Sequence, residues 1–71
     1  MTGGEVMFSQ DQLRRIGRNY VMVEEAWWRA LQIYKHAPTL EELAETAEIS
    51  ITRLRRIRLE MIAAGYPDVL A

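Results

Sequence analysis

The chain has 71 residues, a formal net charge of −1, no cysteine and one histidine. This length predicts one domain with a small core, which leaves little net stability unless the chain oligomerises or gains a disulfide or a metal. Without cysteine there is no disulfide or thiolate metal site, and one histidine is too few for an ordinary zinc site. We therefore expect no metal and no cofactor, and a homodimer becomes a reasonable expectation.

The mildly acidic balance, with a sequence pI of about 5.8, argues against a general nucleic-acid coat protein, which is usually strongly basic. No apolar run approaches the roughly 20 residues that a bilayer-spanning helix needs. The opening residues MTGGEVMF lack the basic and apolar regions of a signal peptide. We expect a soluble, cytoplasmic protein with no membrane partner.

Residues 1–8 contain Gly3-Gly4 and no hydrophobic periodicity, which predicts a flexible N-terminal arm. A single helical domain is predicted over residues 9–71. Its start is marked by Ser9, a good N-cap, because Gln12 stands three residues later in the pattern of a capping box.

The segment 9–36 has an apolar residue at every third or fourth position, which predicts one buried helical face. These residues are Leu13, Ile16, Tyr20, Val23, Trp27, Leu31 and Tyr34. Gly17 and Asn19 weaken the middle, so the segment is either one long bent helix or two helices that break near residues 18–21. Val21 and Trp28 fall off this face, and they indicate either a wide core or a surface for a dimer or a protein partner.

A second, shorter helix is predicted after His36-Ala37-Pro38, because proline disfavours a helical conformation in the residue before it. Thr39 is its predicted N-cap and Glu42 its capping-box partner. Its apolar face is Leu40, Leu43, Ala44 and Ala47. Residues 48–50 form the predicted turn, in which Ser50 can cap the next helix.

The third helix is predicted over residues 50–64, with Leu54, Ile57 and Met61 pointing inward. Gly65 is its expected stop, and Pro67 prevents its continuation. No stretch has the alternation typical of a strand. The predicted fold class is therefore all-α, with three or four helices.

Several residues in the second half match the packing needs of two helices that cross at a tight turn. Ala44 is small where the helices approach, Ile49 is apolar just after the turn, and Leu54 and Ile57 face inward. In these residues, segment 40–59 resembles the helix-turn-helix of bacterial and phage transcription regulators. With both helices taken to their predicted ends, the motif covers residues 39–64. Residues 27–34 then resemble the supporting helix of the three-helix version.

The runs PTLEELA at 38–44 and AGY at 64–66 are also similar to winged-helix regulators, although the sequence contains no segment for a β-wing. One departure concerns the turn, where the family usually has glycine and this chain has Glu48. A glutamate at that position either adopts a left-handed conformation at some energetic cost or lengthens the turn.

The resemblance implies sequence-specific binding of double-stranded DNA, in transcription regulation or phage-type DNA recognition, with the third helix in the major groove. The residues expected to contact bases are Ile51, Thr52, Arg55 and Arg56. Those expected to contact phosphates are Ser50, Arg53 and Arg58. The competing interpretation is a solvated face with weak ion pairs, such as Arg56 with Glu60.

The alternative function is a small interaction module or inhibitor that binds a protein partner, for example the transcription machinery. The acidic balance, Glu48 in the turn and the Val21–Trp28 surface all fit it. An enzyme is not expected, because no histidine or other base is placed to activate Ser9, Thr39 or Ser50. The glutamates at 41, 42, 45 and 48 are interpreted as a solvent-facing surface.

Overall fold

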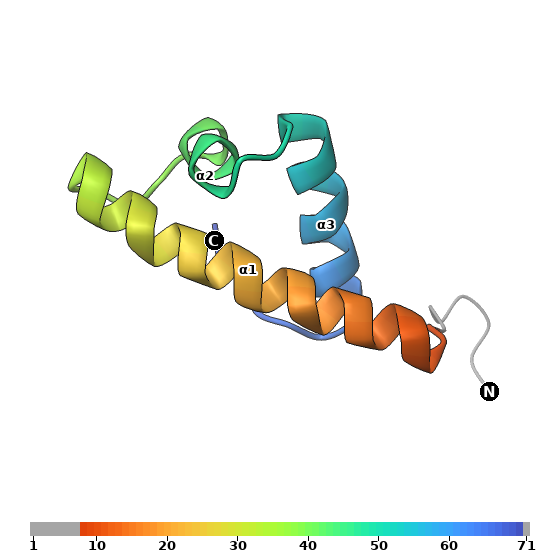
Figure 1. Ribbon diagram of the computed structural model, residues 1–71. Helices are drawn as coiled ribbons and strands as arrows, with labels where there is room; N and C mark the ends of the chain where they lie inside the picture. Colours follow the sequence, from red (N-terminus) through yellow and green to blue (C-terminus); the bar gives the residue numbers. More distant parts are fainter. Residues whose placement is uncertain (1–7, 71) are drawn as a thin grey trace.

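The structure, a computed structural model, describes residues 8–70, and these contain three helices and no strand (Figure 1). The helices are α1 (Gln10–Tyr34), α2 (Leu40–Ala47) and α3 (Ile51–Ala63). The all-α prediction is confirmed. The first segment is one unbroken helix, so of its two predicted alternatives the single long helix is found and the pair of helices with a break near residues 18–21 is wrong. The predicted arm lies outside the described residues except for Phe8, which is half-buried against the core.

Each helix begins where a hydroxyl side chain was predicted to cap it. The Ser9 and Thr39 side chains accept hydrogen bonds from the backbone N–H groups of Gln12 and Glu42, and both capping boxes are complete. The Ser50 Oγ accepts from the backbone N–H of Arg53 at 3.1 Å. Because these bonds satisfy backbone donors at the helix starts, the three starts follow from local sequence alone.

The helices end at residues in the left-handed conformation or immediately before one. Lys35 has φ 65°, Glu48 has φ 60° and Gly65 has φ 97°. At the end of α3 the Tyr66 N–H donates to the Met61 carbonyl at 3.0 Å, and the Gly65 N–H donates to Ile62 at 3.0 Å, the bonding of a Schellman motif. The predicted stop at Gly65 is confirmed. Of the two options for Glu48, the chain adopts the left-handed conformation.

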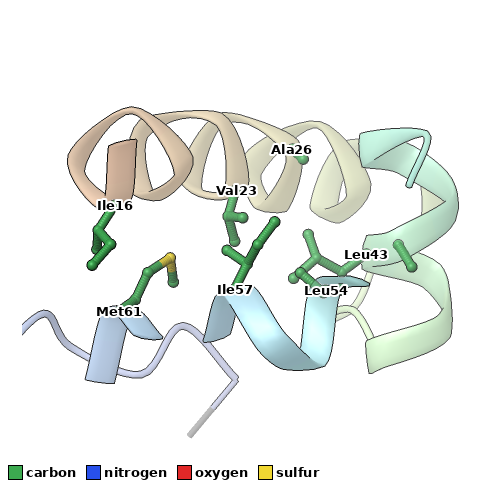
Figure 2. Close-up of a cluster of buried hydrophobic side chains, with 8 residues drawn as sticks. Ile16, Val23, Ala26, Leu43, Leu54, Ile57 and Met61 are labelled. Atoms are coloured by element: carbon green, nitrogen blue, oxygen red, sulfur yellow. The ribbon is translucent and has the colours of Figure 1, made fainter. Parts of the chain in front are cut away.

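The core is built from all three helices around one cluster of buried side chains (Figure 2). Its members are Ile16, Val23, Ala26, Leu43, Ala44, Leu54, Ile57 and Met61. Ile16 faces Met61 and Val23 faces Ile57, so α3 runs back along the N-terminal half of α1. The predicted inward face of α3 is confirmed, since its three residues are at most 2% exposed.

The buried face of α1 differs in part from the predicted one. Leu13 is 44% exposed, so its expected place in the core is wrong, because the buried residues of α1 begin only at Ile16. Ala26 and Ala30 are fully buried although the periodicity did not include them. Both lie in the half of α1 that α2 covers, where a small side chain allows close helix packing (Figure 1).

The segment after α3 closes one side of the core. The Tyr66 ring stacks on Tyr20 of α1, with centroids 4.6 Å apart and an interplanar angle of 22°. A Cβ atom at Gly17 would stand 3.2 Å from the Tyr66 Oη, so the glycine leaves room for this stacking. Val69 and Leu70 also pack against the core. Residues 66–70, called the tail below, therefore pack against the core as part of the fold.

Candidate nucleic-acid interface

The side of α3 that faces away from the core is a polar, largely basic surface. The side chains of Thr52, Arg53, Arg55 and Arg56 are exposed, as sequence periodicity predicted. Leu59 is 68% exposed among them. Ile51 is half-buried and packs against the core, so only part of its side chain is accessible. The packing of Leu54, Ile57 and Met61 fixes which side of α3 faces outward.

The beginning of α3 presents Ser50 at the surface. Its Oγ is already an acceptor for the Arg53 N–H, but the hydroxyl proton remains able to donate to another group. The N-terminal end of a helix carries a partial positive charge, because its first backbone N–H groups point along the axis. This end of α3 is therefore suited to an anionic group.

A groove with a volume of about 390 Å³ runs between α1 and α3. It is lined by Arg15, Asn19, Arg53, Arg56, Ile57 and Glu60. The only ion pair among these residues joins the Arg15 Nη2 to the Glu60 Oε2 at 3.5 Å. Arg15 and Asn19 were not predicted as site residues, because their position beside α3 depends on how the helices pack. Glu60 pairs with Arg15, and the pair with Arg56 that the competing interpretation gave as an example is not formed.

The opposite flank of α3 has a smaller groove of about 250 Å³, lined by Leu40, Arg55, Arg58 and Leu59. Here the sequence separation of Arg55 and Arg53 places them on different sides of α3. The exposed apolar side chain of Leu59 contributes to this flank. The two flanks thus differ in chemistry, since three arginines line the larger groove, whereas two leucines and two arginines line the smaller one.

Arg58 is engaged within the chain. Its Nε donates to the Asp68 Oδ1 at 2.8 Å and its Nη2 donates to Oδ2 at 2.6 Å, a bidentate pair. The backbone N–H of Leu70 also donates to Oδ1, at 3.1 Å. The hydrogen bonds from Arg58 lower the pKa of Asp68 below its ordinary value, with a smaller contribution from Leu70. Contact between Arg58 and a phosphate would compete with this pair.

The acidic residues of α2 lie mostly at the surface, as interpreted from the sequence. Glu41, Glu45 and Glu48 are exposed. The Glu45 carboxylate accepts a hydrogen bond from the Tyr34 hydroxyl at 3.2 Å, and the Glu42 Oε2 lies 3.4 Å from the His36 Nε2. These contacts join the end of α1 to α2. Between residues 8 and 70 no three His, Cys, Asp or Glu side chains are grouped in a way that could hold a metal ion.

Two exposed apolar side chains stand on one side of α1. Trp28 is 58% exposed and Val21 is 53% exposed. The Trp28 ring meets the half-buried Trp27 ring edge to face, with centroids 5.0 Å apart. The wide-core interpretation is therefore wrong within the described part of the chain, since nothing there covers Trp28. The use of this surface by a dimer or a partner stays a prediction.

Comparison of the chain with models of known protein families, with curated proteins and with solved structures gives no match. In the described range, none of the three helices has the combined length and hydrophobicity that crossing a membrane requires.

Proposed function

We propose that this protein binds double-stranded DNA in a sequence-specific manner, as a small transcription regulator or a phage-type DNA-recognition protein. In this proposal α2, the turn at residues 48–50 and α3 act as a helix-turn-helix, and α1 is the supporting helix. One observation carries it: Arg53, Arg55 and Arg56 are exposed on the side of α3 that faces away from the core. A helix held in this way can enter the major groove without loss of its packing.

The proposed contacts divide into base readers and phosphate binders. Arg55 and Arg56 would donate in pairs to guanine O6 and N7, and Thr52 or the accessible part of Ile51 would pack on a thymine methyl. Ser50 and Arg53 would hold phosphates on either side and fix the register. Arg58 would add a phosphate contact only if it leaves Asp68, so we assign it the smallest share.

A single unit of this kind contacts few base pairs, so useful affinity calls for two copies on neighbouring half-sites. The surface around Val21 and Trp28 is the proposed contact between the copies. Val21 and Trp28 belong to α1, whereas the proposed base contacts belong to α3, so pairing through Val21 and Trp28 would leave α3 to the DNA.

The test is fluorescence anisotropy of labelled random-sequence duplex DNA titrated with the protein at low and at moderate salt. We expect binding that weakens steeply with salt and is lost in the double variant Arg55→Ala/Arg56→Ala, because phosphate and base contacts disappear together. The matched control is Arg29→Ala, which removes an exposed arginine from α1. Absence of binding by the unaltered protein even at low salt would refute the proposal.

A second candidate function is a protein-interaction module, for example a small inhibitor of the transcription machinery. The exposure of Trp28 favours it, since exposed tryptophans often anchor interfaces. The two candidates differ in measurable ways. Partner binding would depend on Trp28 and vary little with salt, whereas DNA binding would depend on Arg55 and Arg56 and vary strongly with salt.

A further inference from the structure

We propose that the groove between α1 and α3 holds a phosphodiester group of the DNA backbone, so that Arg15 and Asn19 of α1 belong to the DNA-binding surface. This inference rests on the proposed function and extends it from α3 to the supporting helix. The groove brings together residues from two distant parts of the sequence, Arg15 and Asn19 on one side and Arg53 and Arg56 on the other.

The first argument is the unbalanced charge of the groove. Three guanidinium groups line it against one carboxylate, that of Glu60. Arg15 is the one arginine of the groove with an ion pair in residues 8–70, and its 3.5 Å contact with Glu60 is long. Clustered like charges repel one another, and a bound anion relieves that repulsion. Guanidinium groups bind phosphate oxygens through paired N–H donors, so a phosphate fits this site well.

The second argument is the position of the groove beside the proposed reading surface. Arg56 lines the groove and also stands on the exposed side of α3. The N-terminal half of α1 lies against the end of α3 that follows Arg56 (Figure 1). A helix in the major groove has a phosphate backbone along each flank. The α1 side of α3 would therefore meet one of these backbones, and Arg15 and Asn19 would reach it.

The smaller groove on the other flank gives the contrast. Two of its four lining residues are leucines, and Arg58 is already paired with Asp68. That groove offers one uncommitted cation, Arg55, where the larger groove offers Arg53 and Arg56 together with Arg15. The structure therefore favours the larger groove as the phosphate site.

The experiment compares the salt dependence of duplex binding for Arg15→Gln with two matched controls, Arg14→Gln and Arg29→Gln. All three changes remove one exposed arginine from α1, but only Arg15 lines the groove. For Arg15→Gln we expect affinity about tenfold lower at low salt and a slope of log K against log salt reduced by about one, as for one lost phosphate contact. The controls should change affinity by less than about twofold, as distant screened charges do.

The variant Glu60→Gln supplies a result that a purely structural role would not produce. It removes the carboxylate that competes for Arg15, so we expect duplex binding to tighten by about threefold. Should Arg15→Gln lower the thermal midpoint, Asn19→Asp provides the second test, because it adds a negative charge to the groove and should weaken binding while Arg15 is intact.

The outcomes separate this inference from the proposed function. No duplex binding by the unaltered protein would refute both. Duplex binding that Arg15→Gln and Arg14→Gln weaken equally would overturn the groove site and leave the α3 proposal standing. Saturable binding of inorganic phosphate at constant ionic strength, followed by NMR shifts at Arg15 and Arg53, would overturn the role of the groove in DNA binding if Arg15→Gln left duplex affinity unchanged, because the groove would then be a site for a free anion.

Discussion

The helices α2 and α3 are built alike but present opposite charges to solvent. Each begins at a hydroxyl N-cap and buries apolar residues in the same core. Outside the core, α2 carries three glutamates and no basic residue, whereas α3 carries four arginines and one glutamate. Because packing constrains only the inner side of each helix, the outer side is open to selection for binding. The net charge of −1 does not reveal that acidic and basic residues are concentrated on different helices.

The largest expected effect comes from a change on the inner side of α3. Leu54→Ala removes a side chain that is 1% exposed and should cost about 3 kcal/mol of unfolding free energy, enough to unfold much of a domain this small. Leu59→Ala alters a residue on the outer side that is 68% exposed, and it should change stability by less than about 0.5 kcal/mol. Urea denaturation followed by circular dichroism measures both, and equal losses would contradict the assigned core.

The helix caps allow a sharper comparison of the two helices. Thr39→Ala and Ser50→Ala should each cost about 1 kcal/mol, because each leaves a backbone N–H without its acceptor. Thr39→Ala should cost at least as much, since the Thr39 cap is reciprocated by Glu42 while α3 has Arg53 at the corresponding position. Urea denaturation of both variants tests this order, and a larger loss for Ser50→Ala would contradict it.

The pair between Arg58 and Asp68 ties the outer side of α3 to the tail and predicts a pH dependence. Asp68→Asn should cost at most about 1 kcal/mol at pH 7, because both side chains remain partly exposed to solvent. Folding lowers the pKa of Asp68, so the pair stabilises the fold above the ordinary carboxyl pKa of about 3.9. That contribution is lost as the pH falls through the lowered value.

The urea midpoints of the unaltered protein and Asp68→Asn should therefore differ at pH 7 and converge in strong acid. Arg58→Gln removes the other partner and serves as the control, with the same loss at pH 7. A difference between Asp68→Asn and the unaltered protein that persists undiminished below the folded pKa would show that the effect does not come from this ion pair.

Local sequence was sufficient to predict much of this fold. The caps at Ser9, Thr39 and Ser50 and the stop at Gly65 depend on residues within one helical turn, so a single sequence contains the required information. The inner side of α3 followed from helical periodicity. Periodicity also predicted the exposed arginines of α3, because they stand at the positions of the helix that do not face the core.

Features that depend on packing between distant segments were not predictable in this way. The burial of Ala26 and Ala30 follows from where α2 lies on α1. The meeting of Arg15 with Glu60 joins residues 45 positions apart. Arg58 was predicted to contact phosphate from its position on α3 alone. That position gives no information about Asp68, ten residues later, with which Arg58 pairs in the structure. Periodicity assigns a side to each residue, but not the neighbour that it will meet there.

The smallest effect is expected at Glu48, which lies in the turn between α2 and α3. It is acidic like the exposed residues of α2, and it precedes the start of α3. Its φ of 60° is costly for a residue with a Cβ, so Glu48→Gly should raise stability by about 0.5 kcal/mol, the relief of strain being partly offset by greater freedom in the unfolded chain. Lys35→Gly, at φ 65°, should give a similar gain.

The two glycine variants should differ in DNA binding. Removal of the Glu48 carboxylate takes a negative charge from beside the start of α3, so Glu48→Gly should bind duplex DNA more tightly and Lys35→Gly should not. Glu48→Gln separates the two effects, because it removes the charge while keeping a Cβ at the left-handed position. Tighter binding by Glu48→Gln without a gain in stability would show that charge at this turn, and not its backbone strain, limits the interaction. Unchanged binding by both Glu48 variants would place the turn away from the DNA.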